Sequence, residues 1–380
     1  MDHEKGLLTE GSSKKDYHIV LLVMLVFFVI SLITNILNSI IVDVKESFDL
    51  SLTMTGFLPF TFFIAYGVMS IPAGFLSERF ENKALLSFSF LLMTLASLVF
   101  VFVPTHIVFS FTLFVLGSCM AILQVIINPM LRVAGGEEHF AFNSVVAQLV
   151  FGVASFSSPY LYKYLVNDDA NKNLATILRS FVPEHIPWAS LYLVFSVFCF
   201  VLVLIVLLTK YPTYEKEEGE KAGDSISYMT LIKNKYTHLY FLGIFCYVGI
   251  EQGVGNWISQ FLQEYHQIDP QTFGANTVAY FWAMLTIGCI LGLVLLKIFD
   301  SRKVLVGTTG ITIVCLFFAL LGNSSISLFA FPMLGFFISV MWPIIFSLGL
   351  NSIKNHHGSL SGILCTGIAG GAILPFLIGV

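Results

Sequence analysis

Long apolar runs alternate with short polar segments along the whole chain. A helix of about 20 apolar residues crosses the ~30 Å hydrocarbon core of a bilayer. In lipid the backbone must satisfy its own hydrogen bonds, so apolar runs of this length predict helices. We predict eleven membrane-spanning helices, over residues 18–41, 53–76, 84–103, 107–131, 143–165, 189–209, 239–262, 274–298, 304–322, 326–350 and 359–380.

The composition supports lipid as the solvent of this chain. Hydrophobic residues make up 57% of it and charged residues 11%, whereas a soluble domain carries about 25% charged residues. The net charge is −4 and no basic stripe is present, so we expect no nucleic-acid partner. The six cysteines all lie inside apolar runs without a CxxC pair, so we expect small buried hydrophobes, no disulfide and no metal.

The distribution of positive charge predicts how the chain is oriented. The first apolar run is too long for a signal-peptide core and no small-residue cleavage site follows it, so we expect a retained helix. Fifteen of the nineteen Lys and Arg residues fall on the same side as the N-terminus. Positive charge marks the cytoplasmic side. We therefore expect a multi-pass protein of the plasma or inner membrane with a cytoplasmic N-terminus.

A polar linker divides the chain into two parts. We predict a cytoplasmic tail over residues 1–16, a six-helix bundle over 17–210, a cytoplasmic linker over 211–235 and a second bundle over 236–380. Six and five helices are an odd count for matched halves, and the chain stops inside an apolar run. We expect a twelfth helix in the native protein that is absent from this chain; the alternative is a natural eleven-helix protein.

The segment between the second and third predicted helices carries a motif. Residues 72–83 read PAGFLSERFENK, which resembles the major facilitator signature G-x-L-[AS]-D-R-x-G-R-[RK]. Glu78 replaces the aspartate, and Glu81-Asn82 replaces Gly-Arg. A glycine lets a neighbouring helix approach, and the acid can cap or pair with another helix, so we predict a cytoplasmic latch between access states. The alternative is a charged helix end that marks the membrane boundary. Five positions match: Gly74, Leu76, Ser77, Arg79 and Lys83.

A similar pattern recurs in the second half, where Gly292 precedes Asp300, Arg302 and Lys303. A motif found once in each half indicates parallel repeats, as in the major facilitator fold. We therefore expect an all-α membrane protein of two six-helix bundles related by pseudo-two-fold symmetry. The predicted latch residues are Gly74, Glu78, Arg79, Lys83, Asp300 and Arg302.

Glu251 is the one acidic residue that falls in the middle of a predicted span. A charged carboxylate in lipid costs several kcal/mol unless it is paired or neutral. We predict that Glu251 binds a proton or Na⁺ that is coupled to transport. The alternative is a neutral glutamic acid bonded to a neighbouring backbone.

Amide and aromatic side chains recur at helical spacing in several predicted spans. Amides both donate and accept hydrogen bonds, which suits a ligand with many hydroxyls. Each amide alone also serves as a contact between helices. An exporter of apolar drugs or lipids would instead need an aromatic lining. The predicted sugar contacts are Asn35, Asn38, Gln124, Asn128, Gln148, Gln252, Asn256, Trp257 and Trp342.

No catalytic set is visible at membrane depth, since all nine histidines lie in loops or at span ends. We do not expect an enzyme. A membrane sensor is a second alternative, but the sequence shows no signalling domain.

Several segments resemble the fucose–glucose–galactose permease family of sugar:cation symporters. They are residues 245–249 (FCYVG), 342–349 (WPIIFSLG), 370–375 (GGAILP) and the pair 128–129 (NP). The resemblance implies alternating-access transport of a small neutral sugar by a protein of the lipid bilayer, with H⁺ or Na⁺ as the only possible cofactor. We expect a monomer.

Departures from the family pattern narrow this expectation. The fucose branch has carboxylates where this chain has Ser39 and Gln124, and neither of these residues titrates near pH 7. Glu251 matches a glutamate of the glucose–galactose branch. The resemblance therefore implies a hexose more than fucose, with coupling at Glu251 or by Na⁺. An uncoupled sugar facilitator remains open.

Overall fold

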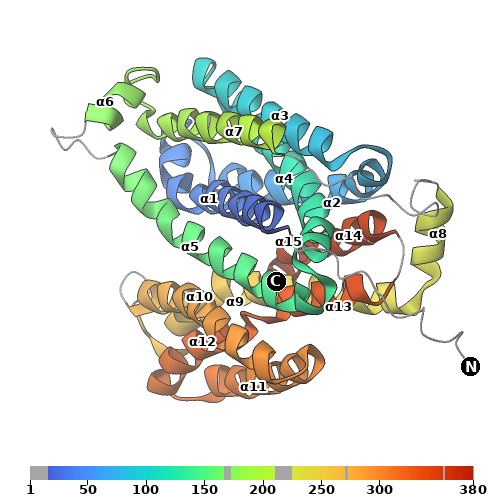
Figure 1. The fold of residues 1–380 in the computed structure, drawn as a ribbon. Helices are drawn as coiled ribbons and strands as arrows, with labels where there is room; N and C mark the ends of the chain where they lie inside the picture. Colours follow the sequence, from blue (N-terminus) through green and yellow to red (C-terminus); the bar gives the residue numbers. More distant parts are fainter. Residues whose placement is uncertain (1–15, 167–172, 210–224, 270–272, 354–355, 380) are drawn as a thin grey trace, which may run out of the picture.

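The structure is a computed structural model that describes residues 16–166, 173–209, 225–269, 273–353 and 356–379. All regular structure in these residues is helical (Figure 1). The long helices are α1 (Tyr17–Ser47), α2 (Leu52–Arg79), α3 (Asn82–Phe102), α4 (His106–Gly135), α5 (Phe140–Val166), α7 (Ser190–Leu208), α9 (Lys235–His266), α10 (Ala275–Ile298), α11 (Ser301–Leu321), α12 (Ser324–Ile338), α13 (Met341–Asn351), α14 (His357–Thr366) and α15 (Gly370–Gly379). Shorter elements are η1 (Glu137–His139), α6 (Asn173–Arg179), η2 (Pro187–Ala189), α8 (Ser225–Lys233) and η5 (Gly367–Ala369).

Over the described residues the predicted spans coincide with helices, and ten helical segments among these residues are long and apolar enough to cross a membrane. The further long helix is α9, whose apolar character is reduced by the polar stripe that includes Glu251, Gln252 and Asn256. Two predicted spans are divided into shorter helices. The span 326–350 is divided between α12 and α13, and the described part of the span 359–380 is divided among α14, η5 and α15.

Side chains that accept backbone N–H groups fix where several helices begin. The first four N–H groups of a helix lack partners inside it. Asp16, Ser51, Thr105 and Asn323 accept from these groups at the starts of α1, α2, α4 and α12. Each of these capping residues lies in the polar segment just before its helix. Polar segments therefore mark the helix starts in the sequence.

Each half of the chain forms its own helical bundle. In the first, α2 packs on α4, α1 on α5 and α3 on α7; in the second, α10 packs on α12, α9 on α15 and α11 on α12. One end of the first bundle is closed by an aromatic cluster, in which Phe100 stacks on Trp188 with 5.6 Å between ring centroids. In Figure 1 the first bundle occupies the upper part and α10–α12 the lower part.

The bundles meet through reciprocal helix pairs. The second helix of the first bundle, α2, packs against α14, and the second helix of the second bundle, α10, packs against α5. Helix α4 also contacts α14, and α5 also contacts α13. This exchange of equivalent helices is what a pseudo-two-fold axis between the halves produces.

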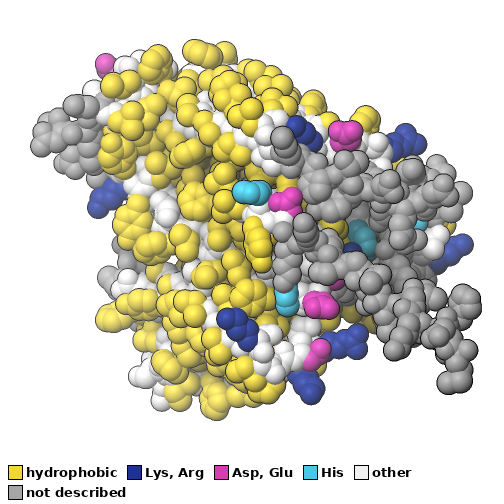
Figure 2. Space-filling view, viewed as in Figure 1, with side chains coloured by type: hydrophobic (Ala, Val, Ile, Leu, Met, Phe, Trp, Pro, Cys, Tyr) yellow, Lys and Arg dark blue, Asp and Glu magenta, His cyan; other side chains and the backbone are white. Residues whose placement is uncertain are grey.

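The outer surface suits a lipid environment. Figure 2 shows hydrophobic side chains over most of one face, with Lys, Arg, Asp and Glu gathered mainly near one end. Large exposed apolar side chains such as Phe111, Phe200 and Phe318 occur on helices of both bundles. A contiguous apolar surface of this kind would be costly in water.

The predicted tail and linker are covered only in part. Residues 1–15 and 210–224 lie outside the described residues. Within the remaining linker, residues 225–233 form α8, which contacts α14.

Candidate functional site: an inter-bundle lock and a polar level above it

Glu78 joins the two bundles at the end of the molecule where the α2–α3 connection lies. Its side chain is 7% exposed, and its Oε1 accepts from the backbone N–H of Ser359 at 2.9 Å. Ser359 lies in the first turn of α14, where free N–H groups and the positive end of the helix dipole favour a carboxylate. The capping role predicted for Glu78 is therefore present, with a helix N-terminus as its partner.

Gly74 permits this contact because it lies one turn before Glu78 on α2. A Cβ at this position would lie 2.8 Å from the Gly358 carbonyl oxygen and 3.1 Å from the Ser359 Cα, and it would also collide with the Tyr228 hydroxyl. Backbone atoms cannot move aside as a flexible side chain can. The close approach predicted for Gly74 is therefore with α14.

Tyr228 of α8 covers the same contact. Its hydroxyl donates to the Ile71 carbonyl oxygen at 2.7 Å. The pKa of Tyr228 is raised to about 12, mainly by burial and also by the nearby Glu78 charge, although hydrogen bonds with Ser359 and the backbone lower it in part. The phenol therefore keeps its proton and remains a donor across the physiological pH range.

Arg132 forms a second link that the sequence analysis missed. It lies in the last turn of α4 with 7% exposure. Its Nε donates to Asn351 Oδ1 at 2.7 Å, its Nη1 lies 3.1 Å from His357 Nε2, and its Nη2 pairs with Glu137 at 2.8 Å. Asn351 and His357 belong to the second bundle. We name Glu78, Arg132, Asn351, His357 and Ser359 the inter-bundle lock.

The other predicted latch residues contact their own bundles. Lys83 donates to the Leu207 and Thr209 carbonyl oxygens at 2.6 and 3.2 Å, at the end of α7. Arg79 lies over the Phe75 ring on its own helix. Asp300 accepts from the Arg302 backbone N–H and caps α11.

The second half places a different group at the equivalent contact between bundles. The Lys297 ammonium of α10 lies 5.5 Å from the Phe142 ring centroid of α5. A cation and an aromatic face attract one another. Neither α5 nor α10 contains an Asp or Glu, so this pair has no carboxylate that caps a helix as Glu78 does.

The predicted sugar contacts of the first bundle have different surroundings. Asn35 donates to the Ser31 carbonyl oxygen at 2.9 Å within α1, and Asn128 donates to the Gln124 backbone oxygen at 2.6 Å within α4. Gln124 is 7% exposed, and its side-chain Oε1 has no donor among the described residues. Gln148 is half-buried on α5, and the side chain of Asn38 lies outside what the structure describes.

Glu251 lies inside the second bundle and is half-buried. The Tyr247 hydroxyl donates to its Oε1 at 3.1 Å, one turn earlier on α9. Gln252 also hydrogen-bonds the carboxyl, and the Cys289 thiol of α10 lies close to it. Among the described residues no Lys or Arg pairs with Glu251, so its environment consists of neutral hydrogen-bonding groups.

The remaining predicted contacts are of two kinds. Trp257 donates its indole N–H to the Pro375 carbonyl oxygen at 2.9 Å, so it connects α9 to α15. Trp342 is buried and stacks on Phe346 with 4.9 Å between centroids. Asn256 is exposed on α9.

Helix register places some of these groups at one level. Counted from the Arg132–Asn351 hydrogen bond, Gln124 lies eight residues along α4 and Trp342 nine residues along α13, or ~12 and ~14 Å at 1.5 Å per residue. On α9, Tyr240 packs on Gly349 of α13. Because α9 and α13 run in opposite directions, Tyr247 reaches the level of Trp342. Glu251 lies one turn further along α9 and is joined to this level by the Tyr247 hydroxyl. We name Gln124, Trp342, Tyr247 and Glu251 the polar level.

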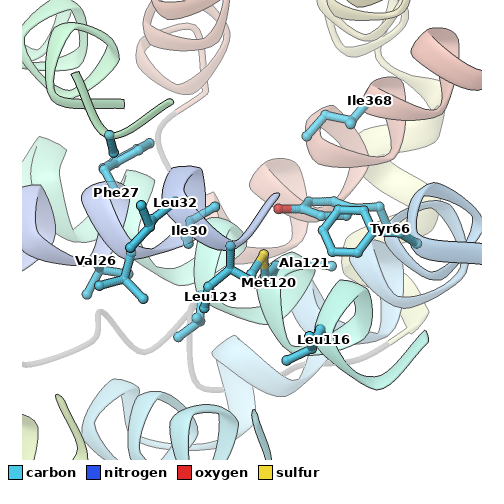
Figure 3. Close-up of a cluster of buried hydrophobic side chains, with 14 of the residues drawn as sticks. Val26, Phe27, Ile30, Leu32, Tyr66, Leu116, Met120, Ala121, Leu123 and Ile368 are labelled. Atoms are coloured by element: carbon cyan, nitrogen blue, oxygen red, sulfur yellow. The ribbon is translucent and has the colours of Figure 1, made fainter. Parts of the chain in front are cut away.

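Apolar packing fills the space around α1, α2 and α4 (Figure 3). In this view Tyr66 of α2 lies between Ile368 of the second bundle and Met120 and Ala121 of α4. Helix α2 contacts both η5 and α4, so Tyr66 brings a buried aromatic ring to the junction of the bundles.

Taken together, the long apolar helices, the two matched bundles and the polar groups where they meet define a polytopic α-helical membrane protein of the two-bundle type. Residues 23–375 match the Major Facilitator Superfamily, and the chain belongs to this family. The superfamily consists of transporters with paired six-helix halves. The fold expected from the repeated motif is confirmed, and the chain is a transporter and not an enzyme.

Individual relatives agree with the family resemblance found in the sequence. A glucose/galactose transporter of Brucella abortus is 31% identical over 387 aligned positions, gaps included, and the alignment covers 98% of this chain and 90% of that protein. The L-fucose–proton symporter of Escherichia coli is 24% identical over 390 aligned positions, covering 97% of this chain and 88% of that protein. The crystal structure of the transporter FucP in its outward conformation superposes with a TM-score of 0.80 at 22% identity, covering 95% of this chain and 91% of that chain.

Proposed function

We propose that this protein carries a neutral, hexose-type sugar across a cell membrane by alternating access, coupled to H⁺ or Na⁺. The relatives named above are a glucose/galactose transporter and a fucose–proton symporter. In this superfamily the substrate site lies near the bilayer midplane between the repeats. The polar level has members from both bundles, which supports a substrate site there in this chain.

The observation that carries the proposal is the buried, unpartnered oxygen of Gln124. A buried acceptor without a donor costs about 1–3 kcal/mol. A sugar hydroxyl is a donor that would relieve this cost when the substrate binds. Trp342 in the other bundle supplies an aromatic ring at the same level, and aromatic faces suit the C–H face of a pyranose.

Glu251 is the coupling residue in this proposal. Its carboxyl has neutral partners, so a bound proton or Na⁺ is the means by which its charge would be compensated. We include Asn35, Asn38, Asn128, Gln148, Gln252 and Asn256 as further members of the substrate path. Trp257 is a weaker candidate because its indole N–H already binds the Pro375 carbonyl.

The lock side of the molecule is the cytoplasmic side in this proposal. Positive charge is favoured on the cytoplasmic side of a membrane protein. On the lock side, helix ends carry Arg79, Lys83, Lys297 and Arg302. Because Glu78 and Arg132 join the bundles there, we assign the present conformation to a state closed to the cytoplasm. We further propose that the protein acts as a monomer in the plasma or inner membrane, with its N-terminus in the cytoplasm.

Uptake by the purified protein in proteoliposomes tests the proposal. Labelled glucose, galactose and fucose are offered with no gradient, with an inward H⁺ gradient and with an inward Na⁺ gradient. We expect concentrative uptake of a hexose that one of the two cation gradients drives and that unlabelled hexoses inhibit. Equilibration without concentration would identify an uncoupled facilitator, and inhibition by apolar drugs but not sugars would contradict the sugar assignment.

A further inference from the structure

The contact between Arg132 and His357 fixes the protonation state of this histidine. A guanidinium can only donate hydrogen bonds. Since Arg132 Nη1 lies 3.1 Å from His357 Nε2, the Nε2 atom must accept. An imidazole ring with an accepting Nε2 is neutral and carries its proton on Nδ1.

We propose that His357 is a proton-binding site that opens the inter-bundle lock. A proton added at Nε2 removes the acceptor for Arg132 and places two cations 3.1 Å apart. Protonation therefore favours the state in which α4 and α14 have separated. Histidine is the side chain that ordinarily changes charge between pH 5 and 8, so acidification of the lock side favours opening of that side.

Three further titratable groups lie near the contact between Arg132 and His357. Arg132 also pairs with Glu137, whose side chain is 65% exposed, so solvent screens much of its effect on the guanidinium. Glu78 and Tyr228 lie near Ser359, two residues further along α14. The Glu78 carboxylate accepts the hydrogen bond from the Ser359 N–H, and this bond stabilises the closed state.

The neighbouring His356 faces the acidic residue of the lock. Its Nδ1 lies 3.9 Å from Glu78 Oε1, which exceeds hydrogen-bond distance. A proton on His357, by contrast, abolishes an existing hydrogen bond to a charged group.

This inference deepens the proposed function, because the lock separates the two access states, yet its test needs no sugar. Spin labels at Glu81→Cys and Lys303→Cys report the distance between the bundles at the lock end; both positions are exposed. The full chain carries these labels in lipid nanodiscs with Cys246 and Cys315, the native cysteines that are not buried, replaced by serine. Distance distributions are recorded at pH 8 and pH 5.5.

We expect the ratio of open to closed molecules to rise at least about tenfold at pH 5.5, the change that follows when one hydrogen bond to a charged group is lost. His357→Gln keeps an acceptor that cannot titrate, so this variant should remain closed at both pH values. His356→Asn is the matched control, because asparagine tolerates the positive φ of 64° at this position, and it should retain the response.

Two results would overturn the proposal: an unchanged distance distribution in the parent, or a pH response that survives His357→Gln. Loss of the response in His356→Asn alone would also overturn it, since the sensor would then be His356. Thermal unfolding of each variant at pH 8 shows that the protein is folded. A chain that shows the expected shift but carries no hexose would contradict only the proposed function.

Discussion

Polar side chains at membrane depth in this transporter differ in whether the protein already satisfies them. Trp257 and Asn35 have hydrogen-bond partners within their own bundles. The side-chain oxygen of Gln124 has none among the described residues. A group that the fold leaves without a partner is the better candidate for binding a substrate, because the ligand then restores a missing hydrogen bond.

Gln124→Leu should weaken sugar binding without loss of the fold. The leucine removes the unpartnered oxygen, so the protein should be as stable as the parent or slightly more stable. The substrate loses one hydrogen bond, and we expect KM to rise about two- to tenfold on the basis of ~0.5–1.5 kcal/mol per bond. Uptake kinetics and thermal unfolding measure the two effects. Asn35→Ala is the comparison: Asn35 lies on the proposed substrate path but already donates within α1, so KM should rise less there, and an equal rise would remove the special status of Gln124.

Glu251→Gln should separate transport from its driving gradient. The amide keeps a hydrogen bond to Tyr247 but cannot bind a proton or hold a cation by charge. Net uptake against a gradient should be lost, while exchange of internal for external sugar continues. Both are measured in proteoliposomes over pH 5.5–8. Uptake that stays equally concentrative, with the same dependence on pH and Na⁺, would contradict a coupling role.

Helices approach closely only where the sequence places small residues at the crossing. Gly74→Ala adds a Cβ against the Gly358 backbone, and overpacking of this kind costs about 1–3 kcal/mol. Because the contact lies between bundles, we expect the cost to reduce the closed state and the uptake rate. Gly307→Ala is the matched control, since nothing lies within 4 Å of its added Cβ. Equal effects of the two substitutions would show that the α2–α14 approach is not special.

How far the sequence predicts an element depends on how local its determinants are. The apolar runs marked every long helix, but α1 continues beyond residue 41 to Ser47. Asp43 therefore lies within the helix, where it accepts from the Tyr162 hydroxyl of α5 at 2.5 Å. Glu78 was predictable as a capping or pairing acid because it lies in a short sequence motif. Only its partner, the start of α14, could not be predicted.

The lock around Arg132 shows what local patterns cannot provide. Its partners Asn351 and His357 lie 219 and 225 residues further along the chain. In the sequence Arg132 is one more positive charge at the predicted cytoplasmic end of a span, as Lys83 is. A signal did exist, because the adjacent histidines His356 and His357 lie just before the predicted span 359–380, but their relation to Arg132 follows only from the packing of α4 on α14.

At the scale of the whole molecule, the two reciprocal helix pairs are unequal. The α2–α14 pair carries a buried carboxylate cap, while α5–α10 carries the contact of Lys297 with Phe142. If the bundles rock apart at the lock end, the hydrogen bond from Ser359 to Glu78 in the α2–α14 pair must break. The strength of the lock is therefore concentrated on one side of the pseudo-two-fold axis.

A disulfide at the lock end should stop transport. A Cβ on Gly358 would touch the Ser77 side-chain oxygen, so Ser77→Cys combined with Gly358→Cys places two thiols within disulfide reach. Oxidation should abolish uptake, and reduction should restore it, because alternating access requires α2 and α14 to separate there. Gly67→Cys with Ala369→Cys is the comparison: the Cβ atoms lie 3.6 Å apart, and the two positions lie 10 and 11 residues along the chain from Ser77 and Gly358, away from the lock end. A link this close to the middle of the helices restricts rocking less, so oxidised protein should retain more uptake. Full uptake by the oxidised Ser77–Gly358 pair would mean that the bundles do not part at this end during transport.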